Sequence, residues 1–386
     1  MLDYLLTDEQ KMLKDLARQV ADEKIRPVAA EYDEKEEFPW PIVKIMAESD
    51  LFGVYIPEEY GGTGGGSMDL VVCVEELSKA CGGISLSLAA TALGTYPLLL
   101  FGSHEQKKKY IPALAAGKKL AAFAITEAEA GSDAGSIRTT AKKDGDYYIL
   151  NGTKQWITNG GEADTYSVVA MTDKTKGARG ASVFIVEKGT KGFEFGKKEK
   201  KLGIRASATR ELVFTDCKVH KDNLLAKEGM GFIVAMKTFD NSRPGVAAQA
   251  LGIAQGALDE AVKYAHQRRQ FGQPISSFQG IQFMLADMAT QIEAARALVY
   301  AVARMLDAGV KDIAQASAMS KLFASDVAMK VTVDAVQIFG GYGYMREYPV
   351  EKYMRDAKIT QIYEGTNQIQ RGVIASHLIK ELAKKK

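Results

Sequence analysis

Four residues belong to types that could bind a ligand and act on it. Trp156 and Thr158 combine an aromatic face with a nearby hydroxyl, which suits a flat ring that has a polar edge. Arg268 carries a guanidinium, which holds phosphate groups through paired, charge-assisted hydrogen bonds. Glu364 carries a carboxylate that could accept a proton, although each of the 48 acidic residues is by default a solvated surface charge. Trp156 could equally be a core aromatic of a β-domain, so residue type alone leaves the site open.

The sequence around these residues resembles one protein family in three separated segments. The first is A-I-T-E-A-E-A-G-S-D at 124–133, and the second is N-G-T-K-Q-W-I-T-N-G at 151–160. The third is Q-I-F-G-G-Y-G at 337–343, followed by R-D-A-K at 355–358 and I-Y-E-G-T-N-Q at 362–368. In this order they resemble the acyl-CoA dehydrogenases, and the resemblance covers essentially the whole chain.

The resemblance implies that the chain binds FAD. Family positions in the first two segments surround the flavin ring, where two threonines bond its polar edge. Arg268, which precedes Phe271 and Gln279 in an R-x-x-F-G pattern, is expected to contact the FAD phosphates from a neighbouring subunit, which implies a homotetramer. The expected cofactor-binding set is Phe123, Ile125, Thr126, Ser132, Trp156, Thr158, Arg268, Phe271, Gln279, Gln337, Ile338, Gly341, Thr366 and Gln368.

The resemblance also implies a reaction, the α,β-dehydrogenation of an acyl-CoA to the 2-enoyl-CoA. It assigns the base to Glu364, which takes the α-proton while hydride passes from the β-carbon to flavin N5. In some branches of the family the base instead stands just before the arginine that matches Arg243, where this chain has Ser242, which cannot serve. The expected substrate-binding residues are Leu93, Ser132, Phe239, Asp240, Arg243, Tyr363 and Gly365.

Residues 84–93 are expected to line the acyl pocket and to limit its size. Ala89, Ala90, Thr91 and Leu93 are small or medium and uncharged, which disfavours a dicarboxylic acyl group because that would need a buried cation. The resemblance to short-chain bacterial members makes butyryl-CoA the first choice. Branched and alicyclic acyl-CoAs stay open, because one methylene changes the binding free energy in such pockets by only about 1–3 kcal/mol.

The patterns around these segments predict an α+β fold with three parts. Residues 1–120 are expected to be helical, beginning after a capping box from Thr7 to Gln10. Short β-rich runs at 166–171, 181–186 and 211–219 predict an antiparallel β-domain over 121–233. Helical periodicity returns in 234–386, with one apolar face from Met284 to Val302, and predicts a C-terminal four-helix bundle.

The amino-acid composition gives no reason to expect nucleic acid, a metal ion or a membrane as a binding partner. The 50 Lys and Arg residues nearly balance 48 Asp and Glu, so the net charge of +2 gives no reason to expect nucleic acid. No metal is expected, because none of the four histidines stands at ligand spacing from another histidine or a cysteine. Neither membrane insertion nor export is expected, because long uninterrupted apolar runs are missing and the first ten residues are acidic, so the default location is the cytoplasm.

Two other functions remain open at this stage. A flavin-binding scaffold of the same fold, without dehydrogenation, would be expected to show a basic surface and a damaged base position. An oxidase would pass electrons to oxygen, and motifs do not separate it from a dehydrogenase that passes them to an electron-transfer flavoprotein, as the family does.

Overall fold

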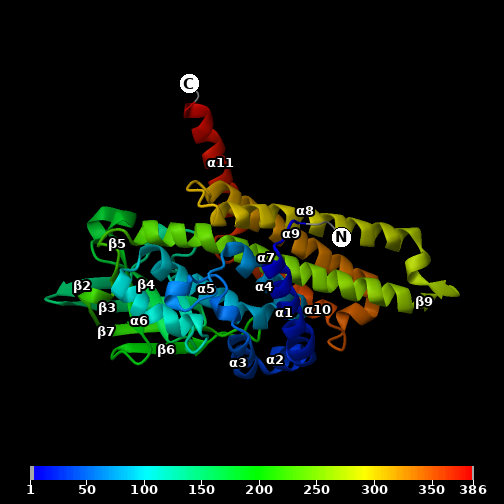
Figure 1. Ribbon diagram of the computed structural model, residues 1–386, viewed down its shortest axis with the longest axis horizontal. Coiled ribbons are helices and arrows are strands. Elements are labelled where there is room, and N and C mark those ends of the chain that lie inside the picture. The colour runs from blue at the N-terminus through cyan, green and yellow to red at the C-terminus, as the bar shows by residue number, and fades with distance from the viewer. Residues whose placement is uncertain (1–3, 385–386) are drawn as a thin grey trace.

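The N-terminal third of the protein is helical, as the sequence predicts. The computed structural model describes residues 4–384 (Figure 1). Six α-helices precede the sheet: α1 (Asp8–Val20), α2 (Ala29–Lys35), α3 (Trp40–Glu48), α4 (Ser67–Ala80), α5 (Gly82–Phe101) and α6 (His104–Ala115). Both hydrogen bonds of the capping box between Thr7 and Gln10 are present, so the predicted start of α1 is confirmed.

The middle of the chain forms a sheet of eight strands within the described residues. They are β1 (Ala121–Ala124), β2 (Thr140–Asp144), β3 (Tyr147–Thr158), β4 (Thr165–Met171), β5 (Ala181–Glu187), β6 (Phe193–Lys198), β7 (Thr209–His220) and β8 (Leu224–Leu225). The spatial order is β6-β7-β3-β2-β4-β5-β8, with β1 beside β4. Most strand pairs are antiparallel, as predicted, but β1 and β2 both pair with β4 in parallel.

The parallel pairing of β1 with β4 accords with the burial of both strands. Every residue of β1 and β4 is buried, because helices cover this part of the sheet, and strands buried on both faces are typical of parallel pairing. Helix α5 approaches β1 closely at Gly94, where a Cβ would lie 2.5 Å from the backbone nitrogen of Ala122. The helix expected to line the acyl pocket is thereby held against the strand that carries Phe123.

The C-terminal part is a helical bundle built around one long helix. Its elements are α7 (Gly231–Gln267), the hairpin β9 (Arg269–Gln270) and β10 (Gln273–Pro274), α8 (Gln279–Asp307), α9 (Ala314–Phe339), α10 (Val350–Thr360) and α11 (Asn367–Lys384). Helix α7 packs on α4, α5, α8 and α9, and runs from the sheet to the hairpin at the far end of the molecule (Figure 1). Helix α11 stands out from the body of the protein.

Helix α5 has the length and apolar composition of a membrane-crossing helix. Most of its side chains are buried against α7, β1 and α6, as in a core helix.

Candidate functional site

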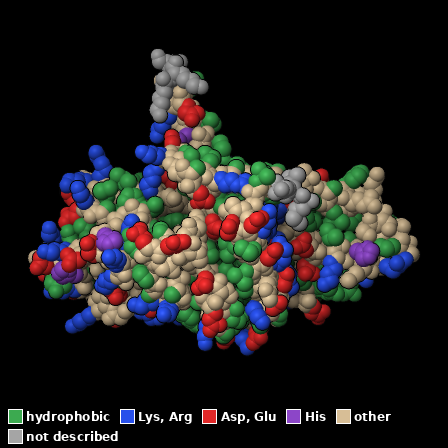
Figure 2. Space-filling view, viewed as in Figure 1, with side chains coloured by type: hydrophobic (Ala, Val, Ile, Leu, Met, Phe, Trp, Pro, Cys, Tyr) green, Lys and Arg blue, Asp and Glu red, His purple; other side chains and the backbone are tan. Residues whose placement is uncertain are grey.

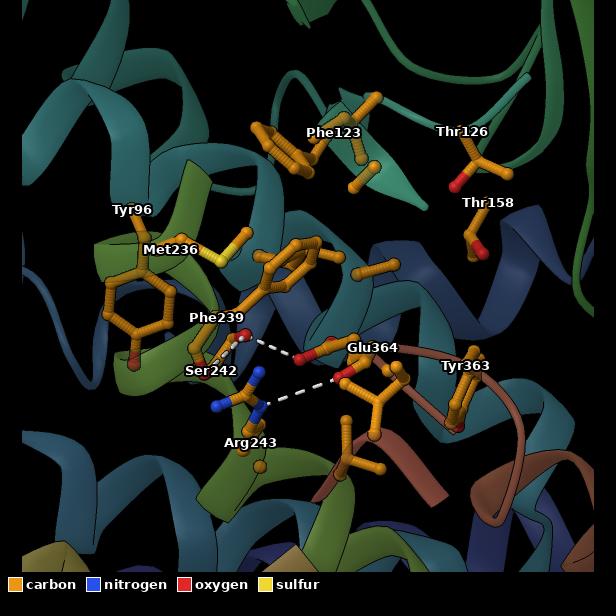
Figure 3. Close-up of a pocket in the computed structure, with 18 of the residues that line it drawn as sticks. Tyr96, Phe123, Thr126, Thr158, Met236, Phe239, Ser242, Arg243, Tyr363 and Glu364 are labelled. Carbon is orange, nitrogen blue, oxygen red and sulfur yellow. Dashed lines mark hydrogen bonds between the residues drawn. The ribbon is translucent and has the colours of Figure 1, made fainter. Parts of the chain in front are cut away.

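A cavity of about 500 Å³ lies where the N-terminal helices, the sheet and the bundle meet. It is lined from α5 on one side, from α7 on another, and from β1, the end of β3 and the turn between α10 and α11. Figure 3 shows Phe123, Thr126 and Thr158 on the sheet side and Glu364 next to Ser242 and Arg243, to which it is hydrogen-bonded. Segments more than 200 residues apart in the sequence therefore meet at one place.

Glu364 occupies the turn that joins α10 to α11. Its backbone is left-handed, with φ of 52°, and Gly365 follows at φ of 90°. Such a conformation is unfavourable for a residue with a side chain and persists only where the surroundings enforce it. Here the surroundings hold the carbonyl of Glu364, which accepts hydrogen bonds from Gln370 Nε2 at 3.1 Å and from Arg243 Nε at 3.4 Å.

The carboxyl group of Glu364 is positioned and tuned by its neighbours. Ser242 Oγ donates a hydrogen bond to Glu364 Oε2 at 2.5 Å. Burial raises the pKa of Glu364 to about 7, against the lowering effects of the Ser242 hydrogen bond and of the positive charges of Arg243 and Lys321. A carboxyl with a pKa near 7 is suited to exchange protons at neutral pH.

The predicted substrate-binding residues gather around Glu364 with one exception. Leu93, Ser132, Phe239, Arg243, Tyr363 and Gly365 line the cavity. Ser132 is exposed at its edge, whereas Tyr363 donates a hydrogen bond to Gln249. Asp240 does not line the cavity; it lies buried behind it and pairs with Arg243 at 3.3 Å.

Three of the four α5 residues expected to line an acyl pocket lie on the wall of the cavity. Ala89, Ala90 and Leu93 line the cavity, but Thr91 does not, so this part of the expectation is wrong. Thr91 faces the sheet, because it lies about 100° further round the helix than Ala90, and its hydroxyl accepts a hydrogen bond from Asn159 Nδ2 at 3.2 Å.

The residues predicted to surround a flavin ring line the cavity wall opposite α7. Phe123, Ile125, Thr126, Trp156 and Thr158 all belong to this wall. Trp156 is 54% exposed, which excludes the alternative of a core aromatic. The hydroxyls of Thr126 and Thr158 form no hydrogen bond with any residue between 4 and 384, so both are available to a ligand. An open aromatic face beside unused hydroxyls fits a flat ring with a polar edge.

A buried ion pair between Lys154 and Glu127, which the sequence analysis does not predict, stabilises this wall of the cavity. Lys154 Nζ donates to the carbonyl of Ile125 at 2.9 Å and to Glu127 Oε1 at 2.8 Å. Glu127 also accepts the backbone N–H of Arg138 and of Thr139. Although burial acts in the opposite direction, the Lys154 ammonium and these donors lower the pKa of Glu127. The pair therefore ties the loop after β1 to β3 on either side of Thr126.

The remaining cofactor candidates lie elsewhere. Arg268, Ile338 and Gly341 line a separate surface pocket at the hairpin end of α7, where the Arg268 guanidinium stacks 5.3 Å from the Tyr342 ring centroid. The others near this end, Phe271, Gln279 and Gln337, belong to the hairpin and to the adjoining ends of α8 and α9. Thr366 and Gln368 are at the start of α11, where Thr366 Oγ1 accepts the N–H of Ile369.

The two groups of cofactor candidates do not meet within one chain. Gln249 lines the cavity and Arg268 follows the same helix 19 residues later, so at about 1.5 Å per residue they are separated by roughly 28 Å.

Sequence reasoning missed several residues of the site. Tyr96 and Met236 line the cavity, and Lys321 lies behind the Glu364 turn. Tyr96 follows Leu93 by three positions on α5, so helical spacing was a signal for it. For Lys321 the sequence holds no signal, because the contact joins α9 to a turn 44 residues away.

We expect Lys154→Met to cost about 3–5 kcal/mol of folding stability, because it leaves the Glu127 carboxylate buried without its cation. Adding Glu127→Gln should recover part of the loss, since it removes the unpaired charge, while the single amide oxygen accepts one of the two backbone N–H groups that bind different oxygens of Glu127. Denaturant unfolding measures both effects. Glu129→Gln, in an exposed pair with Arg138, is the control, and a Lys154→Met loss no larger than its effect would contradict the role given to the pair.

Comparison with known proteins identifies relatives of this chain over nearly its whole length. The acyl-CoA dehydrogenase N-terminal, middle and C-terminal domain models match residues 7–118, 122–217 and 229–379. The chain is 50% identical to the short-chain specific acyl-CoA dehydrogenase of Clostridium acetobutylicum, over 98% of this chain and 100% of that one.

Solved structures agree with the sequence comparison. The butyryl-CoA dehydrogenase of Megasphaera elsdenii superposes with a TM-score of 0.96 at 50% identity, covering 98% of this chain and 100% of that one. A chain of a structure described as the electron transferring flavoprotein of Acidaminococcus fermentans, towards a mechanism of flavin-based electron bifurcation, gives 0.96 at 54% identity, covering 98% and 99%. The chain therefore belongs to the acyl-CoA dehydrogenase family of FAD-dependent oxidoreductases.

Proposed function

We propose that the protein dehydrogenates a short-chain acyl-CoA of about the size of butyryl-CoA to the 2-enoyl-CoA, with Glu364 as the base. The observation that carries the proposal is the Glu364 carboxyl, buried, with a pKa of about 7, across the cavity from an open aromatic wall with unused hydroxyls. A base held on one side of an acyl chain and a flat acceptor on the other is the arrangement that this reaction needs.

The cofactor would be held by the sheet-side wall. Trp156 and Phe123 would contact the flat ring, and Thr126 and Thr158 would donate hydrogen bonds to its polar edge. Bound FAD supplies an acceptor for the hydride that leaves the acyl β-carbon.

The Glu364 residue contributes two groups to the acyl end of the site. Its carboxylate takes the proton from the α-carbon, and Ser242 holds one carboxylate oxygen in place. Its backbone N–H forms no hydrogen bond within residues 4–384, so it is free to donate to the thioester oxygen, where negative charge develops. Both groups belong to a residue that lines the cavity.

Acyl length is proposed to be limited at one end of the cavity. Tyr96, Met236 and Phe239 lie on the side of Glu364 away from Thr126 and Thr158 (Figure 3). Tyr96 is buried, and its ring packs against that of Tyr55 at 5.8 Å, so it has little room to move aside for a longer chain.

The same protein is proposed to work as a homotetramer and to pass electrons to an electron-transfer flavoprotein. The group around Arg268 is too far from the cavity to serve the same cofactor within one chain, which a neighbouring chain would resolve. The likeness to the Acidaminococcus fermentans structure supports the electron acceptor. An inactive scaffold that binds nucleic acid is disfavoured, because basic and acidic side chains are interspersed on the face shown in Figure 2 and the base position is intact.

Replacing the base tests the proposal directly. Glu364→Gln should bind FAD and acyl-CoA but slow anaerobic flavin reduction by about 10²–10⁴-fold, because the amide cannot accept the proton. In the parent the rate should rise with pH through about 7, because the active form is the carboxylate. Glu129→Gln is the exposed control. Stopped-flow absorbance gives both measurements, and a loss below about tenfold would move the base elsewhere.

The limit on acyl length can be tested at Tyr96. Tyr96→Ala should raise kcat/KM for octanoyl-CoA relative to butyryl-CoA by about tenfold or more, since the added space admits further methylenes. Tyr96→Phe keeps the ring and should keep the parent preference. An unchanged ratio in the alanine variant, with FAD content intact, would place the limit at another residue.

Shared cofactor sites predict complementation between two inactive variants. Arg268→Ala should lose FAD, and Glu364→Gln should lose turnover. In a mixed oligomer, one site takes its intact Glu364 from one chain and its intact Arg268 from the other. Co-refolding or co-expression of the two variants should therefore restore FAD binding and turnover at that site. Recovery of activity over the separate variants is the measurement. No recovery, with mixed oligomers shown by mass spectrometry, would mean that Arg268 acts within its own chain.

A further inference from the structure

Lys321 is a buried basic residue that the proposed mechanism does not use, and burial lowers its pKa to about 7. It lies on α9 and is fully buried. Its Nζ donates hydrogen bonds to the carbonyl of Gly365 at 2.9 Å and to Asn367 Oδ1 at 2.8 Å. Both partners are neutral, and Lys321 forms no ion pair with a carboxylate in the part of the chain that the structure describes. Burying an unpaired ammonium is costly, so its retention calls for a compensating role.

The two hydrogen bonds of Lys321 fall on the turn that carries Glu364. Gly365 directly follows Glu364, and its carbonyl also accepts a hydrogen bond from Gln370 Nε2 at 2.8 Å. Asn367 is held in turn by Ser325 Oγ and by the Asp326 carboxylate. Lys321 thus joins α9 to the left-handed segment at Gly365 and to Asn367, which follows it two residues later.

Among the carboxylates near Lys321 in the described residues, only that of Glu364 is not already in an ion pair with another residue. Asp326 already binds Arg371 at 2.9 Å, and Asp240 is paired with Arg243. Glu364 has no ion pair within the described residues, although Lys321 and Arg243 both act on it. The titratable and charged groups that face this region are Tyr96 from α5, Asp240 and Arg243 from α7, Lys321 and Asp326 from α9, Tyr363 from the turn itself, and His377 from α11.

We propose that Lys321 is a positioning residue for the reaction, which holds the Glu364 turn in place and whose positive charge favours the ionised form of the Glu364 carboxyl group. This inference rests on the proposed function, in which Glu364 is the base. Burial lowers the pKa of Lys321 and the Glu364 carboxylate raises it, so each group favours the charged form of the other. Burial alone would keep Glu364 protonated, and Lys321 opposes that effect from the side away from the ligand.

The test is the ionisation of Glu364 itself, followed in the FAD-loaded enzyme without substrate. The infrared band of its protonated carboxyl is identified as the one that Glu364→Gln removes. We expect Lys321→Met to move the midpoint of that band, and of the pH profile of flavin reduction, to higher pH by roughly one unit. Lys330→Met, on an exposed part of the same helix, should leave the midpoint unchanged.

Two further variants separate charge from shape. Ser325→Ala loosens Asn367 without removing a charge, so it should slow the reaction and keep the midpoint. Lys321→Gln keeps an amide donor and should shift the midpoint even if Lys321→Met does not fold. An unshifted midpoint in the Lys321 variants, or an equal shift in Ser325→Ala, would overturn the role given to the charge. Because the infrared midpoint needs no turnover, it answers this question even if another residue is the base.

Discussion

The burial of one carboxyl group, that of Glu364, sets the conditions that the rest of the site has to meet. A carboxylate taken out of water is destabilised, and in a left-handed turn its backbone is strained as well. Three segments offset these costs: α7 supplies Ser242 and Arg243, α9 supplies Lys321, and α11 supplies Gln370. The result is a pKa near neutrality, which neither full exposure nor an ordinary buried ion pair would give.

The wall opposite Glu364 is held by a second buried charge pair with a different purpose. Lys154 and Glu127 form a close ion pair with further hydrogen bonds to the backbone, and this pair braces the loop after β1 against strand β3. Glu364 lacks such a partner and remains free to change its protonation state. The contrast between a paired and an unpaired buried carboxylate explains why one of these glutamates is structural and the other suits chemistry.

The sequence predicts the order of elements and most of the cavity lining, for reasons that are local. Apolar spacing marks α8 and the start of α1, and the motif segments bring Trp156 and Glu364 to attention. The parallel pairing of β1 and β2 with β4 escapes such reasoning, because it depends on which helices cover the sheet. Thr91 was misplaced because residue size does not say which side of α5 faces the cavity, and Lys321 because its contact arises only when α9 and the turn pack together.

The residues that line the cavity come from separate segments of the chain, and this affects how the substrate preference of the protein can change by mutation. Tyr96 on α5 and Met236 on α7 border the proposed acyl end, whereas the proposed proton acceptor, Glu364, lies on a turn more than 100 residues further along the chain. Substitutions at this end leave the hydrogen bonds around Glu364 untouched, apart from those of Ser242 and Arg243, which share α7 with Met236. A gene encoding this scaffold can therefore explore new acyl groups by mutations that are nearly independent of catalytic competence.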